Sequence, residues 1–221
     1  MQTFTTPAPI TATLDIPAGR IQVTATAQDT TTVQIHPADP GKNRDVKLAG
    51  QITVSCSDGV LRIAAPAGQR ILGSTGAVEV TIQLPAGSRL QATAASAQLT
   101  TTGPLGDVTF DSSQGTVTVG EAATARLTTV DGDITVGRLD GDAEIRTARG
   151  DIEVTEATRG TVVLRTQTGA ITVGAAAGTS AALDAGTTVG RIHNALTNTG
   201  GTPALTIHAT TTVGDITASS R

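Results

Sequence analysis

The stretch Gly132-Asp133-Ile134-Thr135-Val136 decides the fold of this chain, because close copies of it recur along the second half of the sequence. The copies lie at residues 115–119, 132–136, 150–154 and 169–173, with looser ones at 190–193 and 214–218. Successive copies are 17, 18, 19, 21 and 24 residues apart. Repetition at a nearly constant spacing indicates a stacked architecture, in which each unit buries its apolar side against its neighbours.

A second strand lies between successive copies, as the alternating stretches 143–147 and 162–166 show. A coil of about 18 residues, made of two short strands and two turns, is typical of a narrow, β-helix-like solenoid. The wider spacing of the last copies predicts a larger loop around residues 195–203. We find no helical periodicity.

The first 95 residues alternate apolar and polar side chains, which predicts strands with one buried face. The dipeptide Asp58-Gly59 between two such runs indicates a hairpin. Pro-Ala-Gly at 17–19 and 85–87 predicts tight turns, and the stretches 37–47 and 69–76 predict loops. We therefore expect an all-β protein with a single domain over 1–221. It comprises a strand and hairpin section (1–95) followed by a β-solenoid (96–221).

The composition restricts the function. Of the 221 residues 38% are hydrophobic but only 1% aromatic, so the core is built from aliphatic side chains and an aromatic-lined pocket is not expected. The net charge of −4, without a basic stretch, argues against nucleic-acid binding. The single cysteine, Cys56, cannot form an intrachain disulfide, and we interpret it as a half-buried strand residue.

Two observations bear on location. No segment approaches the ~18 apolar residues that a membrane span needs. Residues 1–7 also lack the charged and apolar regions of a secretory signal. The expected location is the cytoplasm if Met1 is the native start, and the cell surface otherwise.

The layout resembles the bacterial toastrack family of β-strand-repeat, adhesin-like proteins. The resemblance rests on the repeated Gly-Asp-Ile-x-Val phrase, on the strand-Pro-Ala-Gly-strand units, and on the ending Thr212-Val213-Gly214-Asp215-Ile216-Thr217-Ala218. It covers nearly the whole chain. It implies a β-solenoid one sheet wide with roles in surface adhesion, envelope-stress sensing or assembly, and it implies no catalytic residues.

Aspartates recur at one turn position of the repeat. Stacked carboxylates could hold Ca²⁺, whereas an aspartate that accepts a hydrogen bond from its own downstream backbone is the simpler interpretation. The column is interrupted by Thr116, Ala170 and Arg191, so we predict no metal site. Charged side chains also recur at matching positions of the coils and are expected to pair across them: Arg126, Arg146, Arg165, Glu144 and Asp184.

The outward position of the repeat forms a flat, threonine-rich face. Its members are Thr118, Thr135, Glu153, Thr172, His193 and Thr217. Glu153 and His193 interrupt the threonine array that an ice-binding surface would need. The first four residues are the candidate binding face.

Catalytic and cofactor sites are not expected. His193 and His208 lie in late coils, but no further ligands complete a zinc site. No serine lies in a nucleophile elbow, and paired carboxylates for glycoside cleavage, although open as an alternative, would lack aromatic sugar platforms. We predict no enzyme activity and no cofactor.

The last strand, residues 210–219, carries a single charge and no proline. An uncapped solenoid exposes an unpaired strand at its end, so the candidate self-association edge is Val213, Asp215, Ile216 and Thr217, unless the loop at 195–203 covers it. The leading hypothesis is therefore a non-enzymatic scaffold that forms homo-oligomers through this edge or binds an unknown protein partner. The alternative is a module that binds a ligand or partner on the threonine-rich face.

Overall fold

The computed structural model describes residues 1–66 and 76–221, which hold seventeen strands and one helix. The described chain is therefore almost entirely β, as the repeat predicts. Two compact units, residues 1–115 and 116–221, are described separately; the prediction of a single domain stays a prediction.

The first unit is organised around β2 (Thr11–Thr26), which pairs in parallel along most of its length with β7 (Arg89–Gln114). The first half of β2 also pairs with β5 (Val60–Ala64), and its second half with β6 (Val78–Pro85). The predicted turn at 17–19 therefore does not end a strand: it is the corner at which β2 changes partner, and Gly19 adopts a φ of 136° there.

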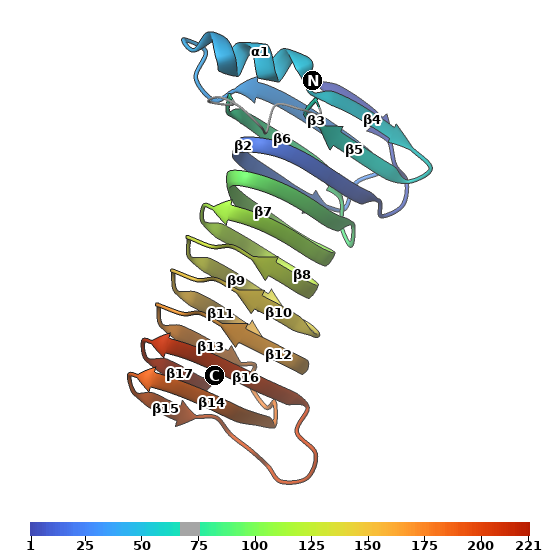
Figure 1. Ribbon diagram of the computed structural model, residues 1–221. Helices are drawn as coiled ribbons and strands as arrows, with labels where there is room; N and C mark the ends of the chain where they lie inside the picture. The colour runs from blue at the N-terminus through green and yellow to red at the C-terminus, as the bar shows by residue number, and fades with distance from the viewer. Residues whose placement is uncertain (67–75) are drawn as a thin grey trace. The chain divides into compact units, whose positions relative to one another are not determined.

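Short antiparallel strands complete this unit (Figure 1). Strand β3 (Thr30–Pro37) lies between β1 (Gln2–Thr5) and β6. Strand β4 (Thr53–Ser57) forms with β5 the hairpin predicted at Asp58-Gly59, whose φ values of 51° and 72° fit a two-residue turn. The turn predicted at 85–87 separates β6 from β7.

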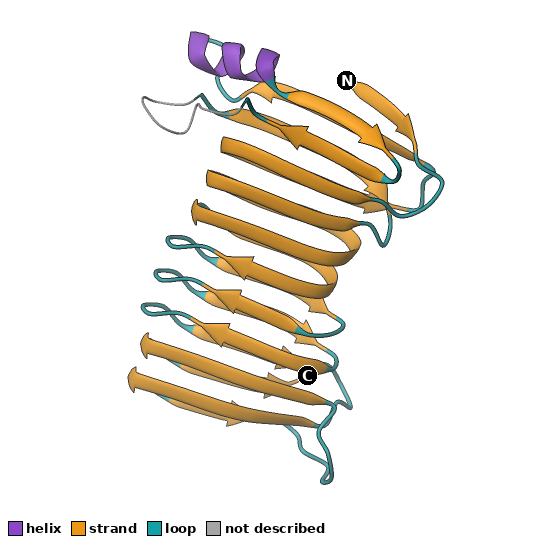
Figure 2. Cartoon of the chain, turned by 45° about the vertical axis from the view of Figure 1, so that its right-hand side comes forward, coloured by secondary structure: helices purple, strands orange, loops and turns teal. Residues whose placement is uncertain are grey.

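Helix α1 (Asn43–Gln51) corrects the sequence analysis, which predicted a loop over 37–47 (Figure 2). The helix contacts β3 and β6, and its Leu48 is buried. Its buried Asp45 accepts a hydrogen bond from the Ala77 amide at 3.0 Å. The contacts of Asp45 and Leu48 therefore hold the helix in place. The second predicted loop, 69–76, falls almost entirely outside the described residues.

The second unit is the predicted solenoid, with one strand of each coil in each of two columns (Figure 1). Strand β8 (Val117–Thr128) contributes to both columns. One column continues through β9 (Ile134–Leu139), β11 (Ile152–Ala157) and β13 (Ile171–Ala175). The other continues through β10 (Ala143–Arg146) and β12 (Gly160–Arg165). All these neighbours are parallel, and they are in register except for a shift between β11 and β13 after Val154, so equivalent side chains of successive coils stack.

The last two coils do not stack in chain order. Strand β16 (Leu205–Val213) pairs with β12 on one side and with β14 (Ala181–Val189) on the other. Strand β17 (Ile216–Ser220) likewise pairs with both β13 and β15 (Ile192–Ala195). The final coil, made of β16 and β17, therefore lies between the coil of β12 and β13 and the coil of β14 and β15. The predicted large loop joins β15 to β16 and returns the chain to this position.

One corner of the coil explains the repeated glycine. At Gly169 the backbone adopts a φ of 151°, and a Cβ atom there would overlap the carbonyl oxygen of Gly150 in the adjacent coil. The same close contact joins Gly150 to Gly132, Gly214 to Gly169, and Gly190 to Gly214. Only glycine fits where consecutive corners stack so closely.

A threonine ladder, which the sequence analysis missed, fastens the same corner. Threonine lies three residues before Gly150, Gly169, Gly190 and Gly214, and its hydroxyl donates a hydrogen bond to a glycine carbonyl of the neighbouring coil. The donor and acceptor pairs are Thr147 with Gly132, Thr166 with Gly150, Thr211 with Gly169, and Thr187 with Gly214, at 3.0–3.2 Å. The recurring Thr-x-x-Gly spacing was the available signal.

Candidate functional site

The prediction that the last strand forms the open edge of the solenoid is wrong. Val213 pairs with Val189, and Ile216 and Thr217 of β17 are paired on both sides, with β13 and with β15. Ile216 and its neighbours therefore lie inside a column, and Asp215 lies at the corner between β16 and β17. Within residues 1–66 and 76–221, the strands with one free side at this end are β14 and β15.

The free side of β14 presents unpaired backbone groups. The Ser180 carbonyl accepts from the Leu205 amide, toward β16, whereas the Ala181 amide donates away from β16 to the Thr197 carbonyl. Because successive residues of a strand direct their N–H and C=O groups to opposite sides, Leu183, Ala185 and Thr187 direct theirs away from β16. The loop 196–204 therefore occupies only the start of this edge.

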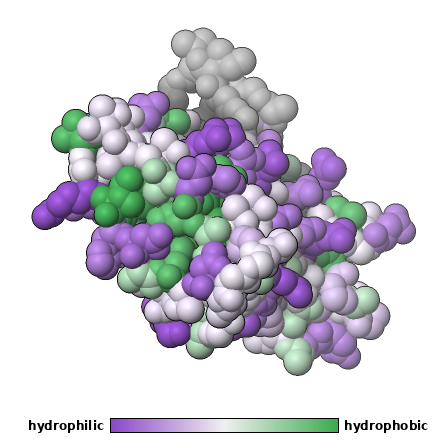
Figure 3. Space-filling model, turned by 90° about the horizontal axis from the view of Figure 1, so that it is seen from below, coloured by the Kyte–Doolittle hydropathy of each residue, from purple (hydrophilic) through white to green (hydrophobic). Residues whose placement is uncertain are grey.

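The apolar core is also open at this end. Ile192 is 46% exposed, whereas its equivalents Ile216, Ile171 and Ile134 are fully buried. Val189, at the end of β14, is 60% exposed. Figure 3 looks onto this end and shows hydrophobic surface surrounded by polar side chains. An open edge and an uncovered core therefore coincide.

The aspartate column is a ladder between coils, which corrects the prediction of local turns. The carboxylate of Asp133 accepts a hydrogen bond from the Asp151 amide at 2.8 Å, and that of Asp151 accepts from the Ala170 amide at 2.7 Å. At the open end, Asp215 accepts from the Arg191 amide at 2.8 Å. Each carboxylate thus satisfies a donor in the next coil.

Asp215 makes the attachment of the end coil sensitive to acid. The hydrogen bond from the Arg191 amide, assisted by the Arg191 charge, lowers the pKa of this carboxyl. A lowered pKa stabilises the fold above the unfolded value of about 3.9. This stabilisation is lost as the pH falls through the folded pKa. We expect Asp215→Ala to lower the free energy of unfolding at pH 7 but not at pH 2, as measured by urea titration; an equal loss at both pH values would contradict this role.

The threonine-rich face is in register, as the repeat predicts. Thr118 pairs with Thr135, Thr135 with Glu153, and Glu153 with Thr172. Thr217 follows Thr172 because of the inserted coil, so His193 ends the row. All these side chains are exposed or half-buried. The structure thus provides a flat surface there, and its use for binding stays a prediction.

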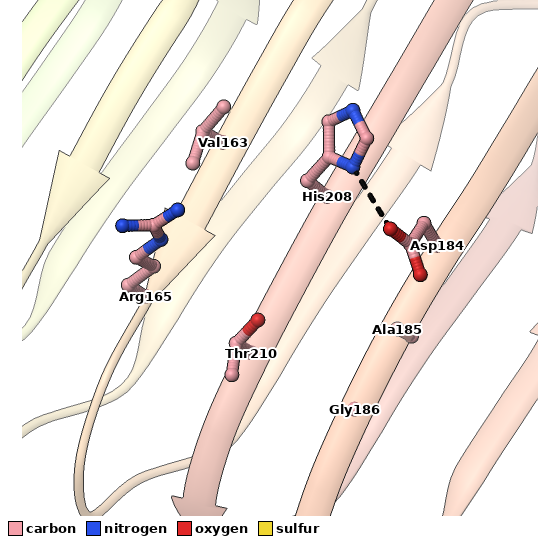
Figure 4. Close-up of a pocket in the computed structure, with 7 residues that line it drawn as sticks. All are labelled: Val163, Arg165, Asp184, Ala185, Gly186, His208 and Thr210. Carbon is pink, nitrogen blue, oxygen red and sulfur yellow. Dashed lines mark hydrogen bonds and ion pairs between the residues drawn. The ribbon is translucent and has the colours of Figure 1, made fainter.

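A hollow of about 430 Å³ lies on the other column, across β12, β16 and β14 (Figure 4). Its side chains include Arg165, His208, Thr210 and Asp184. Arg165 and Asp184 were predicted to pair across adjacent coils, and His208 was considered only as a metal ligand. Their grouping with His208 could not be predicted, because β16 lies unexpectedly between β12 and β14.

The remaining candidate groups stay apart. His193 and His208 lie in different columns, and within residues 1–66 and 76–221 no three His, Cys, Asp or Glu side chains are grouped as metal ligands. Cys56 is half-buried in β4, as predicted, and burial raises the pKa of its thiol. No helix in the described part of the chain is both long and apolar enough to cross a membrane.

Known proteins with this fold come from several bacteria. A candidate adhesin of Bacteroides fragilis has 14% identity and a TM-score of 0.50, with 98% of this chain and 95% of that chain covered. A candidate cell adhesion protein of Clostridium sporogenes has 12% identity and a TM-score of 0.40, with 100% and 98% covered. A candidate lipid-binding protein of Parabacteroides distasonis has 10% identity and a TM-score of 0.46, with 98% and 95% covered.

At such identities these likenesses concern the fold alone. No curated protein matches the sequence. The profile of the Toastrack DUF4097 family, however, matches residues 12–221, which include the glycine corners and the inserted final coil. The chain belongs to the Toastrack DUF4097 family.

Proposed function

We propose that this chain is a non-enzymatic interaction scaffold that associates with a second copy of itself through the free edges of β14 and β15. The observation that carries the proposal is that, among the residues that the structure describes, both edge strands are paired on one side only, while Ile192 at the start of β15 is half-exposed. An unpaired edge next to apolar surface is a template for strand addition.

The edge lacks the usual protection against such pairing. Neither β14 nor β15 contains lysine or proline, and the single charge in the two strands at neutral pH, apart from histidine, is Asp184. Asp184 lies on the outer face, where it contacts His208 rather than the free edge. Charged edges, prolines and bulges are the devices that prevent edge-to-edge association.

A second copy fits this edge better than a single extended peptide. A two-fold axis normal to the columns would place β14 antiparallel to its counterpart and β15 antiparallel to its own. Both columns would then continue at once, and the two exposed Ile192 side chains would be covered. Closed two-fold pairing through the same surface is the commonest form of self-association. A lone peptide strand would extend one column only.

A lysine in the end coil tests this proposal. We expect Ile192→Lys to yield a monomer, because the charge would be buried at the paired end. His193→Lys is the matched control, since the adjacent side chain lies on the outer face of the same strand and should leave association unchanged. Sedimentation velocity across a concentration series measures both. The proposal fails if the two variants and the unmodified chain sediment alike.

The threonine-rich face supports a second candidate function, the binding of a partner. Its support is the in-register stacking of Thr118, Thr135, Glu153 and Thr172 on consecutive coils. A chain that stays monomeric at all concentrations would favour this function over self-association.

A further inference from the structure

The hollow on β12, β16 and β14 consists of two rows of side chains on one outer face (Figure 4). Strand register places Arg165, Thr210 and Gly186 in one row, and Val163, His208 and Asp184 in the other. These residues lie far apart in sequence. The rows exist only because the final coil is inserted between its predecessors.

Gly186 creates the floor of the hollow. No atom lies within 4 Å of the position that a Cβ would occupy there, so the space beside Thr210 is open. Thr210 is exposed and offers a hydroxyl, and Arg165 stands on the other side of it. A ligand group placed over Gly186 would therefore meet a hydroxyl and a guanidinium from neighbouring strands.

Arg165 differs from most arginines of the second unit. Arg126, Arg138, Arg149 and Arg191 each form an ion pair with a carboxylate of an adjacent coil. The neighbours of Arg165 in register are instead Arg146 and Thr210, and among the described residues it forms no ion pair. The pairing with Asp184 that the sequence suggested does not occur, because β16 intervenes. An unpaired guanidinium is suited to binding a carboxylate through two parallel hydrogen bonds.

The second row offers hydrogen-bond acceptors. His208 Nδ1 lies 3.2 Å from Asp184 Oδ2. If Nδ1–H donates to Asp184, the Nε2 atom of a neutral ring is left as an acceptor. The Asp184 side chain is 82% exposed and keeps further lone pairs free. This row is therefore suited to ligand hydroxyl groups.

The balance of charge selects the kind of anion. The hollow combines one unpaired arginine with the carboxylate of Asp184, so a doubly charged phosphate would be repelled by Asp184 as well as attracted by Arg165. A carboxylate carries one charge, and hydroxyl groups next to it would satisfy Asp184 and His208.

We propose that this hollow binds a small hydroxylated carboxylic acid, of the chemical class of the uronic acids. The carboxylate is held by Arg165 and Thr210 over Gly186, and the neighbouring hydroxyls are held by Asp184 and His208. The site lies on the outer face rather than on the free edge of β14, so this proposal is independent of self-association.

Titration of the isotope-labelled full chain with glucuronate, followed by amide chemical shifts, tests the proposal. We expect saturable shifts centred on residues 165, 186, 208 and 210. Arg165→Gln should weaken binding at least about tenfold, because it removes a charge-assisted hydrogen-bonding pair. Arg126→Gln is the matched control: it removes the same charge from the same column, outside the hollow, and should leave the affinity unchanged.

Further outcomes are decisive. Glucose should give no saturable shifts, because it lacks the carboxylate. The proposal is overturned if glucuronate gives no saturable shifts, if both arginine variants lose affinity equally, or if inorganic phosphate binds more tightly than glucuronate.

Discussion

Gly169→Ala is expected to lower the free energy of unfolding by at least about 3 kcal/mol. Two effects act together at this corner. The φ of 151° is a conformation that alanine rarely adopts, and the added methyl group would overlap the backbone oxygen of Gly150. Backbone atoms cannot move aside as a flexible side chain can, so adjacent coils would have to separate. Urea unfolding followed by circular dichroism measures the loss.

Two further glycines separate these effects. Gly178 has a φ of 76° but open space around its Cβ position, so Gly178→Ala should show the conformational penalty of about 1 kcal/mol alone. Gly186 has neither constraint, and Gly186→Ala should be nearly neutral. Similar losses at Gly169 and Gly178 would show that the stacking of corners contributes nothing.

Ile216→Pro is expected to lower the free energy of unfolding by about 4 kcal/mol. The Ile216 amide donates to the Arg191 carbonyl at 2.8 Å, and its side chain is fully buried. Proline removes the donor and part of the core packing, and it would detach β15 from β17. Thermal and urea unfolding measure the loss.

Ile192→Pro is the matched control, because it occupies the same position of the adjacent coil. The Arg191 carbonyl is directed toward β17, so the Ile192 amide is directed toward the free edge, where proline is tolerated. The loss should be clearly smaller than at Ile216. If Ile192→Pro is the more damaging of the two, the order of the last coils is not the one described.

Almost every feature of the coil can be predicted from the sequence. Stacking requires the same residue type at the same corner, so Gly150 and Gly169 leave a visible trace, and the core isoleucines follow at a fixed distance. The hairpin at Asp58-Gly59 is equally local, because two residues with positive φ suffice to define it. Each of these features depends on residues that are adjacent in sequence or that occupy the same position in successive repeats.

The order of the last coils cannot be predicted from residues that are close in sequence. The copies at 190–193 and 214–218 both fit the same corner of the coil, and the repeat does not indicate which of them lies between two other coils. One residue carries a signal. Asn194 occupies the position that Ala218 and Val173 fill in the adjoining coils. An amide there is poorly suited to the interior and marks its coil as the end.

Helix α1 and the hollow were not predicted, because both depend on contacts between segments that are distant in sequence. Nine residues with no side-chain cap at Lys42 give a weak helical pattern, and contacts with β3 and β6 supply what the pattern lacks. Arg165, Asp184 and His208 become neighbours only through the insertion of β16. Each of these features depends on contacts between distant segments.

The most direct test of the central claim is the solution mass of the unmodified chain, determined by light scattering behind size exclusion over a wide range of concentrations. Pairing through β14 and β15 predicts a species of twice 22.1 kDa whose share grows with concentration. A mass of 22.1 kDa at every concentration would contradict it.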